Sequence, residues 1–517
     1  MPSREILRKW PAILVLIAFS TLARGQQNEA PAPLPRQLPQ RPVIPAQRPA
    51  VVRPVQQLPR PGVRQLPQQQ QQQRPVQQPG VRQQPQIGVR RPVQPGVQPQ
   101  MGERRGLKPG VGPRGQPGER GLGGRTIQNV QFRGGGRGQV SYRPNGKLAG
   151  VHVNGLNIDR GIHGGRKVMA QRNGRTLVST GLHQGYVERP YLNRGGRMYY
   201  QRTYVAGGRA YARAYRGYDY HGARYYGYCP AHYYHPAFYA WASRPWARPV
   251  HYTPAAWGWA DAPWFTAYSG YFTPYPAYRA PAFWLTDFVI AGNLQVGYQS
   301  SVMVGQPPDS GGGNEPPPDG SEIDGNQTPI NPQVKQAIAM EVEQQIGQEQ
   351  VEANAQTQNP QGGPQASQMP DALNPSQRVF IVASDIDTAL QTGQECSLSG
   401  GDVVQRTSDD PDANQNVTAT VMSSKQGNCP SGQSVMVSAQ DLQEMHNQFR
   451  EKIDEGLQTM AEQAGDAGLP PPPDNGSTPG EVPPPAPDAG APAQLDAAQN
   501  LADQIEGQVQ SGAATAM

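Results

Sequence analysis

The sequence predicts a mostly disordered multi-module chain, with an antiparallel β meander, an aromatic-rich segment and a small C-terminal β domain followed by a long α-helix. Three observations lead to this fold class. Only 36% of the 517 residues are hydrophobic, and 60 Gly with 56 Pro make more than a fifth of the chain, so large parts cannot bury enough apolar surface to fold. Glycines recur every 9 to 12 residues from Gly146 to Gly208. Six of the seven Trp residues lie between Trp241 and Trp284.

Residues 1–25 have the order of a secretory signal peptide. Three basic residues near the N-terminus precede the apolar run Trp10–Leu22, and small residues follow before a cleavage site expected after Gly25. The apolar run is shorter than the roughly 20 residues that span a bilayer; an uncleaved anchor is the alternative. We therefore expect export to the periplasm, outer envelope or cell surface, and we do not expect nucleic acid as a partner.

Residues 26–125 are expected to form a disordered, basic spacer. The triplets RPV and PGV each occur four times there, and Pro at this density favours extended polyproline II over helix. Through Gln299 the chain carries a formal charge of +31, and after Gln299 it carries −24. This division predicts an anionic partner for the first half, or pairing between the halves of one or several molecules.

Residues 126–210 have the pattern of an antiparallel meander of about six short strands. Dipeptides such as Asn154-Gly155 readily take the positive φ angles of tight hairpin turns, and the runs between them partly alternate apolar and polar residues. A basic sheet face could contact a polyanion, and a solvated face is the alternative. The arginines expected to make this contact are Arg166, Arg172 and Arg175.

Residues 211–300 form a Tyr-, Trp- and Pro-rich segment. Its many prolines predict turns and short extended pieces, with one terminal packed or interfacial helix of 12 to 15 residues within Pro281–Gln299. Because Trp and Tyr are amphipathic, their rings suit a membrane interface, a sugar platform or a protein contact. The residues expected to make this surface contact are Trp241, Trp246, Trp257, Trp259 and Trp264.

Cys229, His232 and His235 are the only clustered residues of metal-ligand types. Their spacing could present three ligands to Cu or Zn. No second paired motif accompanies them, so the alternative is an incidental group of aromatics and histidines. Cys229 is also the odd one of three cysteines, which in an oxidising compartment either stays buried or joins two chains.

Two linkers, residues 301–331 and 357–375, flank an amphipathic helix over residues 332–356. Apolar residues recur there at every fourth position, from Val334 to Ile346. The stripe is narrow, so we expect this helix to pack against another copy or against the preceding domain.

Residues 376–465 are predicted to form a small β barrel plus helix. Four strands are expected, and Cys396 and Cys429 should form a disulfide in an exported protein. Ser438 is the expected N-cap of a helix of about 24 residues. Residues 466–517 read as a disordered, acidic, Pro- and Ala-rich tail, with a possible short helix at Ala491–Gln510.

The turn and strand Leu398-x-x-Gly-Asp-Val-Val404 resemble those of bacterial SH3-like small barrels, which are often attached to exported envelope proteins. The resemblance implies a peptide- or cell-wall-binding module, but Phe380 is the only aromatic residue between Arg378 and Gln440, which favours a scaffold role. The segments FWLTDFVIAGNLQ, PQVKQAIAMEV and DLQEMHNQFREKIDEGLQTMA also resemble an uncharacterised group of exported bacterial proteins.

No catalytic motif with the necessary context occurs, so neither an enzyme nor a cofactor is expected. We expect an exported, non-enzymatic cell-envelope or surface protein that contacts anionic envelope polymer or a membrane surface through its basic, aromatic-rich half. One alternative is a self-assembling structural or scaffold protein that forms a homo-oligomer. The other is a metal-binding protein or enzyme that uses Cys229, His232 and His235.

Overall fold

The computed structural model describes residues 122–181, 183–304, 327–359, 369–463, 465, 468–512 and 514–516. The predicted signal peptide, nearly all of the predicted spacer and most of the two linkers lie outside these described residues. Within the described ranges, every helix is too short or too polar to cross a membrane.

A long antiparallel meander confirms the predicted β region and extends it. Successive strands pair in chain order, and Asn154 and Asn173 take positive φ angles of 47° and 52° in the expected hairpin turns. The strands are β1 (Thr126–Gln131), β2 (Arg137–Tyr142), β3 (Leu148–Val153), β4 (Leu156–Arg160), β5 (Arg166–Arg172), β6 (Arg175–Gly181), β7 (Gln184–Arg194), β8 (Arg197–Ala206), β9 (Arg209–Tyr220) and β10 (Ala223–Cys229), with β19 (Thr515–Ala516) paired to β1.

The prediction of only turns and short pieces in residues 211–229 was wrong. These residues complete β9 and form β10, and the meander has ten strands rather than about six. The physical reason is that no Pro stands between Pro190 and Pro230, so nothing interrupts the ladder, and the Tyr-rich sequence favours strands.

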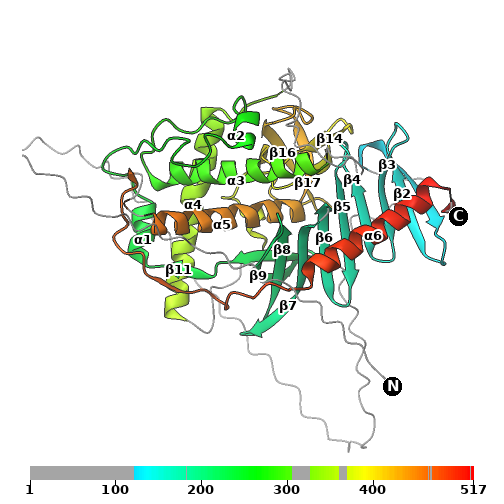
Figure 1. Cartoon of the computed structure of the whole chain (residues 1–517), viewed down its shortest axis with the longest axis horizontal. Helices are drawn as coiled ribbons and strands as arrows, with labels where there is room; N and C mark the ends of the chain where they lie inside the picture. Colours follow the sequence, from blue (N-terminus) through cyan, green and yellow to red (C-terminus); the bar gives the residue numbers. More distant parts are fainter. Residues whose placement is uncertain are drawn as a thin grey trace, which may run out of the picture. The chain divides into compact units, whose positions relative to one another are not determined.

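One face of the sheet is apolar and is covered by the C-terminal helix α6 (Ala491–Gln510), which crosses the strands in Figure 1. Val168 and Leu177 of the sheet pack with Leu495 and Ala502 of the helix. The predicted helix at Ala491–Gln510 is confirmed.

The rest of the C-terminal region differs from the predicted disordered tail. β18 (Ser477–Pro479) pairs with β11 (His232–Tyr234), and Glu481 and Val482 are buried against the sheet. Disorder was predicted from composition alone. The segment is ordered because basic strands of the first half form a surface of complementary charge on which it packs.

The outer edge of β10 is closed by side chains of α5 (Ala439–Glu462). Asn447 donates to the carbonyl of Tyr226 at 2.8 Å and accepts from the N–H of Tyr228 at 3.0 Å, and Gln440 donates to the carbonyl of Arg224. An edge strand capped in this way cannot pair with another chain.

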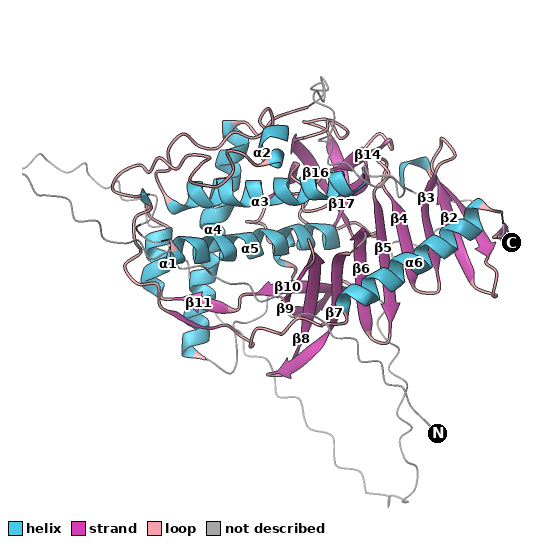
Figure 2. Cartoon of the chain, viewed as in Figure 1, coloured by secondary structure: helices cyan, strands magenta, loops and turns pink. Residues whose placement is uncertain are grey.

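Five α-helices surround an aromatic core (Figure 2): α1 (Pro236–Ala242), α2 (Pro263–Ala267), α3 (Pro281–Val304), α4 (Pro332–Gln358) and α5. The helix expected to span 12 to 15 residues is the 24-residue α3, and Trp284, Leu285 and Leu294 on it are fully buried. α4 and α5 begin at side-chain caps, Asn331 and the predicted Ser438. α4 packs on α3 and α1 of its own chain, so its apolar stripe needs no second copy.

The C-terminal β region contains the four predicted strands in one sheet of order β12-β15-β16-β17, beside a separate hairpin of β13 and β14. In the described residues these strands do not close into a barrel. The predicted Cys396–Cys429 disulfide is present and joins the hairpin to the loop before β17. The bounds are β12 (Val379–Ile381), β13 (Ile386–Ala389), β14 (Glu395–Leu398), β15 (Val403–Arg406), β16 (Asn416–Ser423) and β17 (Ser434–Ser438), with short 3₁₀ turns η1 (Leu122–Gly124) and η2 (Asp371–Leu373).

Segments predicted as separate modules share one core. Trp284 of the aromatic segment, Val342 of α4, Val403 of the C-terminal sheet and Leu457 of α5 belong to the same buried cluster. The modules read from composition are therefore layers of one folded unit.

Candidate binding surface

The tryptophans expected at a contact surface instead build the aromatic core. Trp246 and Trp264 are buried, and Trp241, Trp257 and Trp259 are partly buried against the same cluster. Trp257 lies between Trp259 and Trp284, with ring centroids 4.3 and 4.4 Å away. Most of the ring surface is thus used for packing and is not available to a partner.

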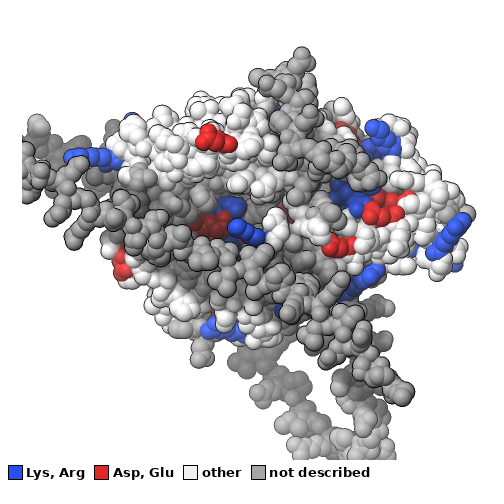
Figure 3. Space-filling view, in the orientation of Figure 1, with Lys and Arg blue, Asp and Glu red and all other residues white. Residues whose placement is uncertain are grey.

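Two of the three expected sheet arginines are paired within the chain. Arg166 contacts Glu506 at 3.1 Å and also Asp503, both on α6, and Arg175 contacts Asp488 at 3.2 Å. Basic and acidic side chains accordingly lie next to one another where α6 crosses the sheet (Figure 3). Arg172 is exposed and has no carboxylate partner in the described part of the chain.

The proposed metal ligands are not gathered into a site. Cys229 is buried, and burial raises the pKa of its thiol to about 12. His232 lies edge-on to Tyr234, while His235 accepts from the N–H of Ala237 at the start of α1 and lies 3.3 Å from Asp474. Among the described residues no three His, Cys, Asp or Glu side chains are arranged to hold a metal ion.

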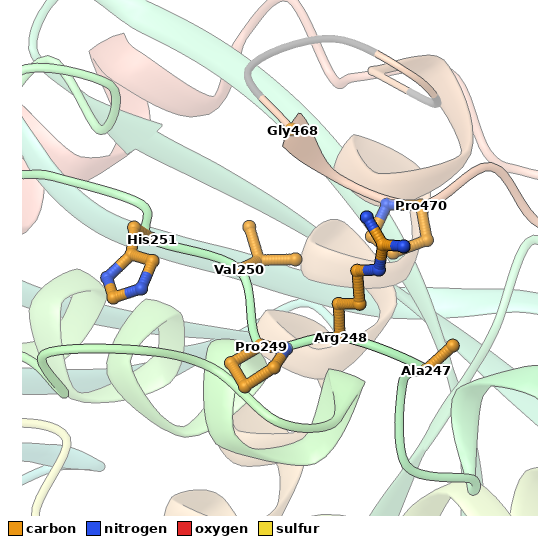
Figure 4. A pocket seen from close by; sticks show the side chains of 7 residues that line it. All are labelled: Ala247, Arg248, Pro249, Val250, His251, Gly468 and Pro470. Atoms are coloured by element: carbon orange, nitrogen blue, oxygen red, sulfur yellow. The ribbon is translucent and has the colours of Figure 1, made fainter. Parts of the chain in front are cut away.

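A pocket of about 450 Å³ lies beside segment 245–251 (Figure 4). The segment is held by backbone hydrogen bonds, from Trp246 N–H to the carbonyl of Arg279 at 2.7 Å and in both directions between Val250 and Tyr278 at 2.8 Å. The pocket is lined by Ala247, Arg248, Pro249, Val250, His251, Gly468 and Pro470.

Exposed residues of basic type lie on the segment that lines this pocket and on its neighbours in the chain fold. Arg248 and His251 line it, Arg279 lies on the chain opposite, and Arg244 follows the partly exposed Trp241. We call these four residues the basic patch. Within the described ranges no carboxylate pairs with any of them, in contrast to the sheet arginines under α6.

The comparisons with known proteins add no identity. No family model, curated protein or solved structure matches this chain. The basic patch therefore has to be judged on its own chemistry, which is that of forked guanidinium donors around a shallow apolar pocket.

Sequence reasoning did not single out the basic patch. A usable signal was the run RPWARPVH, in which two Arg-Pro pairs flank Trp246. The buried ring of Trp246 anchors the run while the two arginines stay exposed. The pairing of the sheet arginines with α6 could not be read from sequence, because more than 300 residues separate the partners.

Proposed function

We propose that this is an exported, non-enzymatic protein of the cell envelope or cell surface that binds an anionic envelope polymer through the basic patch. The observation that supports this most is that, among the described residues, Arg244, Arg248 and Arg279 have no carboxylate partner, whereas most of the other described arginines do. A guanidinium without a carboxylate partner is free to bind phosphate, sulfate or carboxylate groups bidentately.

The partly exposed Trp241 beside Arg244 adds an apolar surface to the same patch. A polymer with rings and anionic groups could use both features, the ring face by stacking and the charges by hydrogen bonds. The C-terminal sheet packs against α4 and α5, which suits the scaffold role that its scarcity of aromatic residues favours.

The test is binding of the mature full-length protein to dextran sulfate at low salt, with neutral dextran as the uncharged comparison. The variant Arg244→Gln/Arg248→Gln/Arg279→Gln should bind about tenfold more weakly, because three exposed charges each contribute a few tenths to 1 kcal/mol. The difference in affinity between the wild type and the variant should shrink as the salt concentration rises, because salt screens the charges.

The matched control changes three other exposed arginines, Arg133, Arg172 and Arg209, to Gln. It removes the same net charge and leaves the basic N-terminal segment in place, so it should keep affinity within about threefold of the wild type. Equal losses in the two variants would reject a local site. Binding to anionic lipid vesicles but not to dextran sulfate would replace the polymer by a membrane surface.

A further inference from the structure

A lysine and an aspartate meet in the interior between α3 and α4. Lys335, in the first turn of α4, is 4% exposed, and Asp287, on α3, is fully buried. The Nζ atom of Lys335 lies 2.6 Å from Oδ1 of Asp287. It also donates to the carbonyl of Thr273 at 2.9 Å and lies 3.6 Å from the ring centre of Tyr275.

The two oxygens of Asp287 differ in their contacts. Oδ2 accepts two hydrogen bonds, from the N–H of Tyr275 at 2.6 Å and from the hydroxyl of Tyr278 at 2.8 Å. Oδ1 has no hydrogen-bond partner among the described residues, although Nζ of Lys335 is so close. The amine therefore approaches the carboxyl group outside the angles of a hydrogen bond.

The surroundings make a charged pair costly at this position. Phe272, Tyr275 and Tyr278 exclude water, and burying two full charges costs several kcal/mol each before their attraction is counted. Burial raises the pKa of Asp287 and lowers the pKa of Lys335, in each case against the attraction of the partner. Both directions favour the neutral carboxylic acid and the neutral amine, which are the two reactants of amide formation.

We propose that Lys335 and Asp287 are joined by an intramolecular amide bond. Nζ attacks Cγ of the protonated carboxyl group and forms the new C–N bond. Oδ2 carries the developing negative charge, which the N–H of Tyr275 and the hydroxyl of Tyr278 stabilise as an oxyanion hole does.

The C–Oδ1 bond then breaks. Oδ1, which carries the carboxyl proton, takes one of the two amine protons and leaves as water, and Nζ keeps the other proton. No oxidant or other reactant is needed. Proximity lowers the barrier to the reaction, because two groups held in contact in a dry site react as if they were at very high concentration. The product replaces the buried acid and amine with one amide and ties α3 to α4 covalently.

Trypsin provides a direct test on the wild-type protein. No Lys or Arg lies between Arg279 and Lys335, or between Lys335 and Arg378. Because trypsin does not cut after an acylated lysine, the denatured and reduced protein should give a single peptide, Ala280–Arg378, lighter by one water than its sequence. Two ordinary peptides, Ala280–Lys335 and Gln336–Arg378, would overturn the proposal, as would an uncut peptide of full mass.

Two variants separate bond formation from folding. Lys335→Met removes the amine at similar side-chain volume, and its peptides should carry no loss of water. Tyr278→Phe keeps the ring and removes one of the two donors to Oδ2, so a smaller fraction of the chains should be joined, at unchanged far-UV circular dichroism. If all Tyr278→Phe chains carried the amide bond, Tyr278 would not be a positioning residue for the reaction. The outcome is independent of polymer binding, because no residue of the basic patch takes part in the reaction.

Discussion

The sheet with its acidic cover and the helical aromatic core are stabilised in opposite ways. Under α6, the sheet is held by a modest apolar stripe and by ion pairs in which partly exposed arginines, Arg160 and Arg166, contact the buried Glu506. Around α3, stacked rings fill the interior and the charged groups are deeply buried. The comparison shows that ion pairs hold the distant halves of the chain together at the sheet, whereas the packing of aromatic rings stabilises the core.

This difference predicts two modes of failure. Damage to the ring core should unfold the whole unit, because sheet, helices and C-terminal strands all contact it. Loss of a pair under α6 should release that helix locally, since a surface element with few buried contacts can open without global unfolding.

The largest effect is expected for Trp284→Ala. The side chain is fully buried, with Trp257 stacked at 4.4 Å and Phe288 at 5.4 Å. Truncation should lower the free energy of unfolding by about 3–5 kcal/mol, measured by urea denaturation. The control Trp259→Ala truncates a partly exposed ring of the same stack and should lower the free energy of unfolding by less than half as much. Equal losses in the two variants would contradict the expectation that the more deeply buried ring contributes more stability.

A pH dependence should come from the helical core. Glu349 on α4 is 1% exposed, and burial raises the pKa of its carboxyl to about 8, against the attraction of Arg450. The folded state therefore holds a proton that the unfolded state releases above its ordinary pKa of 4.5. Stability from this group is complete below that value and is lost as pH rises toward 8, on the order of 5 kcal/mol in all.

Glu349→Gln should flatten this alkaline decline, since the amide resembles the protonated acid. The measurement is the free energy of unfolding in urea from pH 5 to pH 8.5; an unchanged slope in the variant would show that Glu349 is not the group responsible. On the acid side, burial lowers the pKa of His446 to about 3 from its ordinary 6.5, so stability should also fall as pH drops below 6.5.

Local chemistry in the sequence predicted much of the fold. The Asn-Gly turns predicted the meander. Ser438 and the apolar spacing after it predicted α5, and two cysteines in a chain expected to be exported predicted the disulfide. Each of these features depends on neighbouring residues or on a simple pairing rule, so a single sequence contains enough information.

The arrangement of the layers could not be predicted in the same way. That Trp257 packs on Trp284, that Asp287 meets Lys335, or that Glu481 is buried against Arg216 depends on contacts between distant segments. Composition therefore led to two wrong predictions. Trp and Tyr occur both on binding surfaces and in cores, so composition could not show that these rings are buried. The acidic C-terminal tail has the composition of a disordered segment, and only the fold shows the basic surface on which it packs. The candidate site shifted for that reason from the sheet arginines to the unpaired basic patch.

The smallest effect is expected at the sheet, for Glu506→Gln. Glu506 is 3% exposed and accepts two hydrogen bonds from Arg160, at 2.7 and 2.6 Å. Removing its charge should cost about 1–2 kcal/mol, and amide hydrogen exchange should speed up in α6 but not in α3. Asp503→Asn is the control: its side chain is 59% exposed, so the change should stay within about 0.5 kcal/mol. Faster exchange in both helices of Glu506→Gln would mean that the cover and the core unfold together, and that the two regions are not energetically separate.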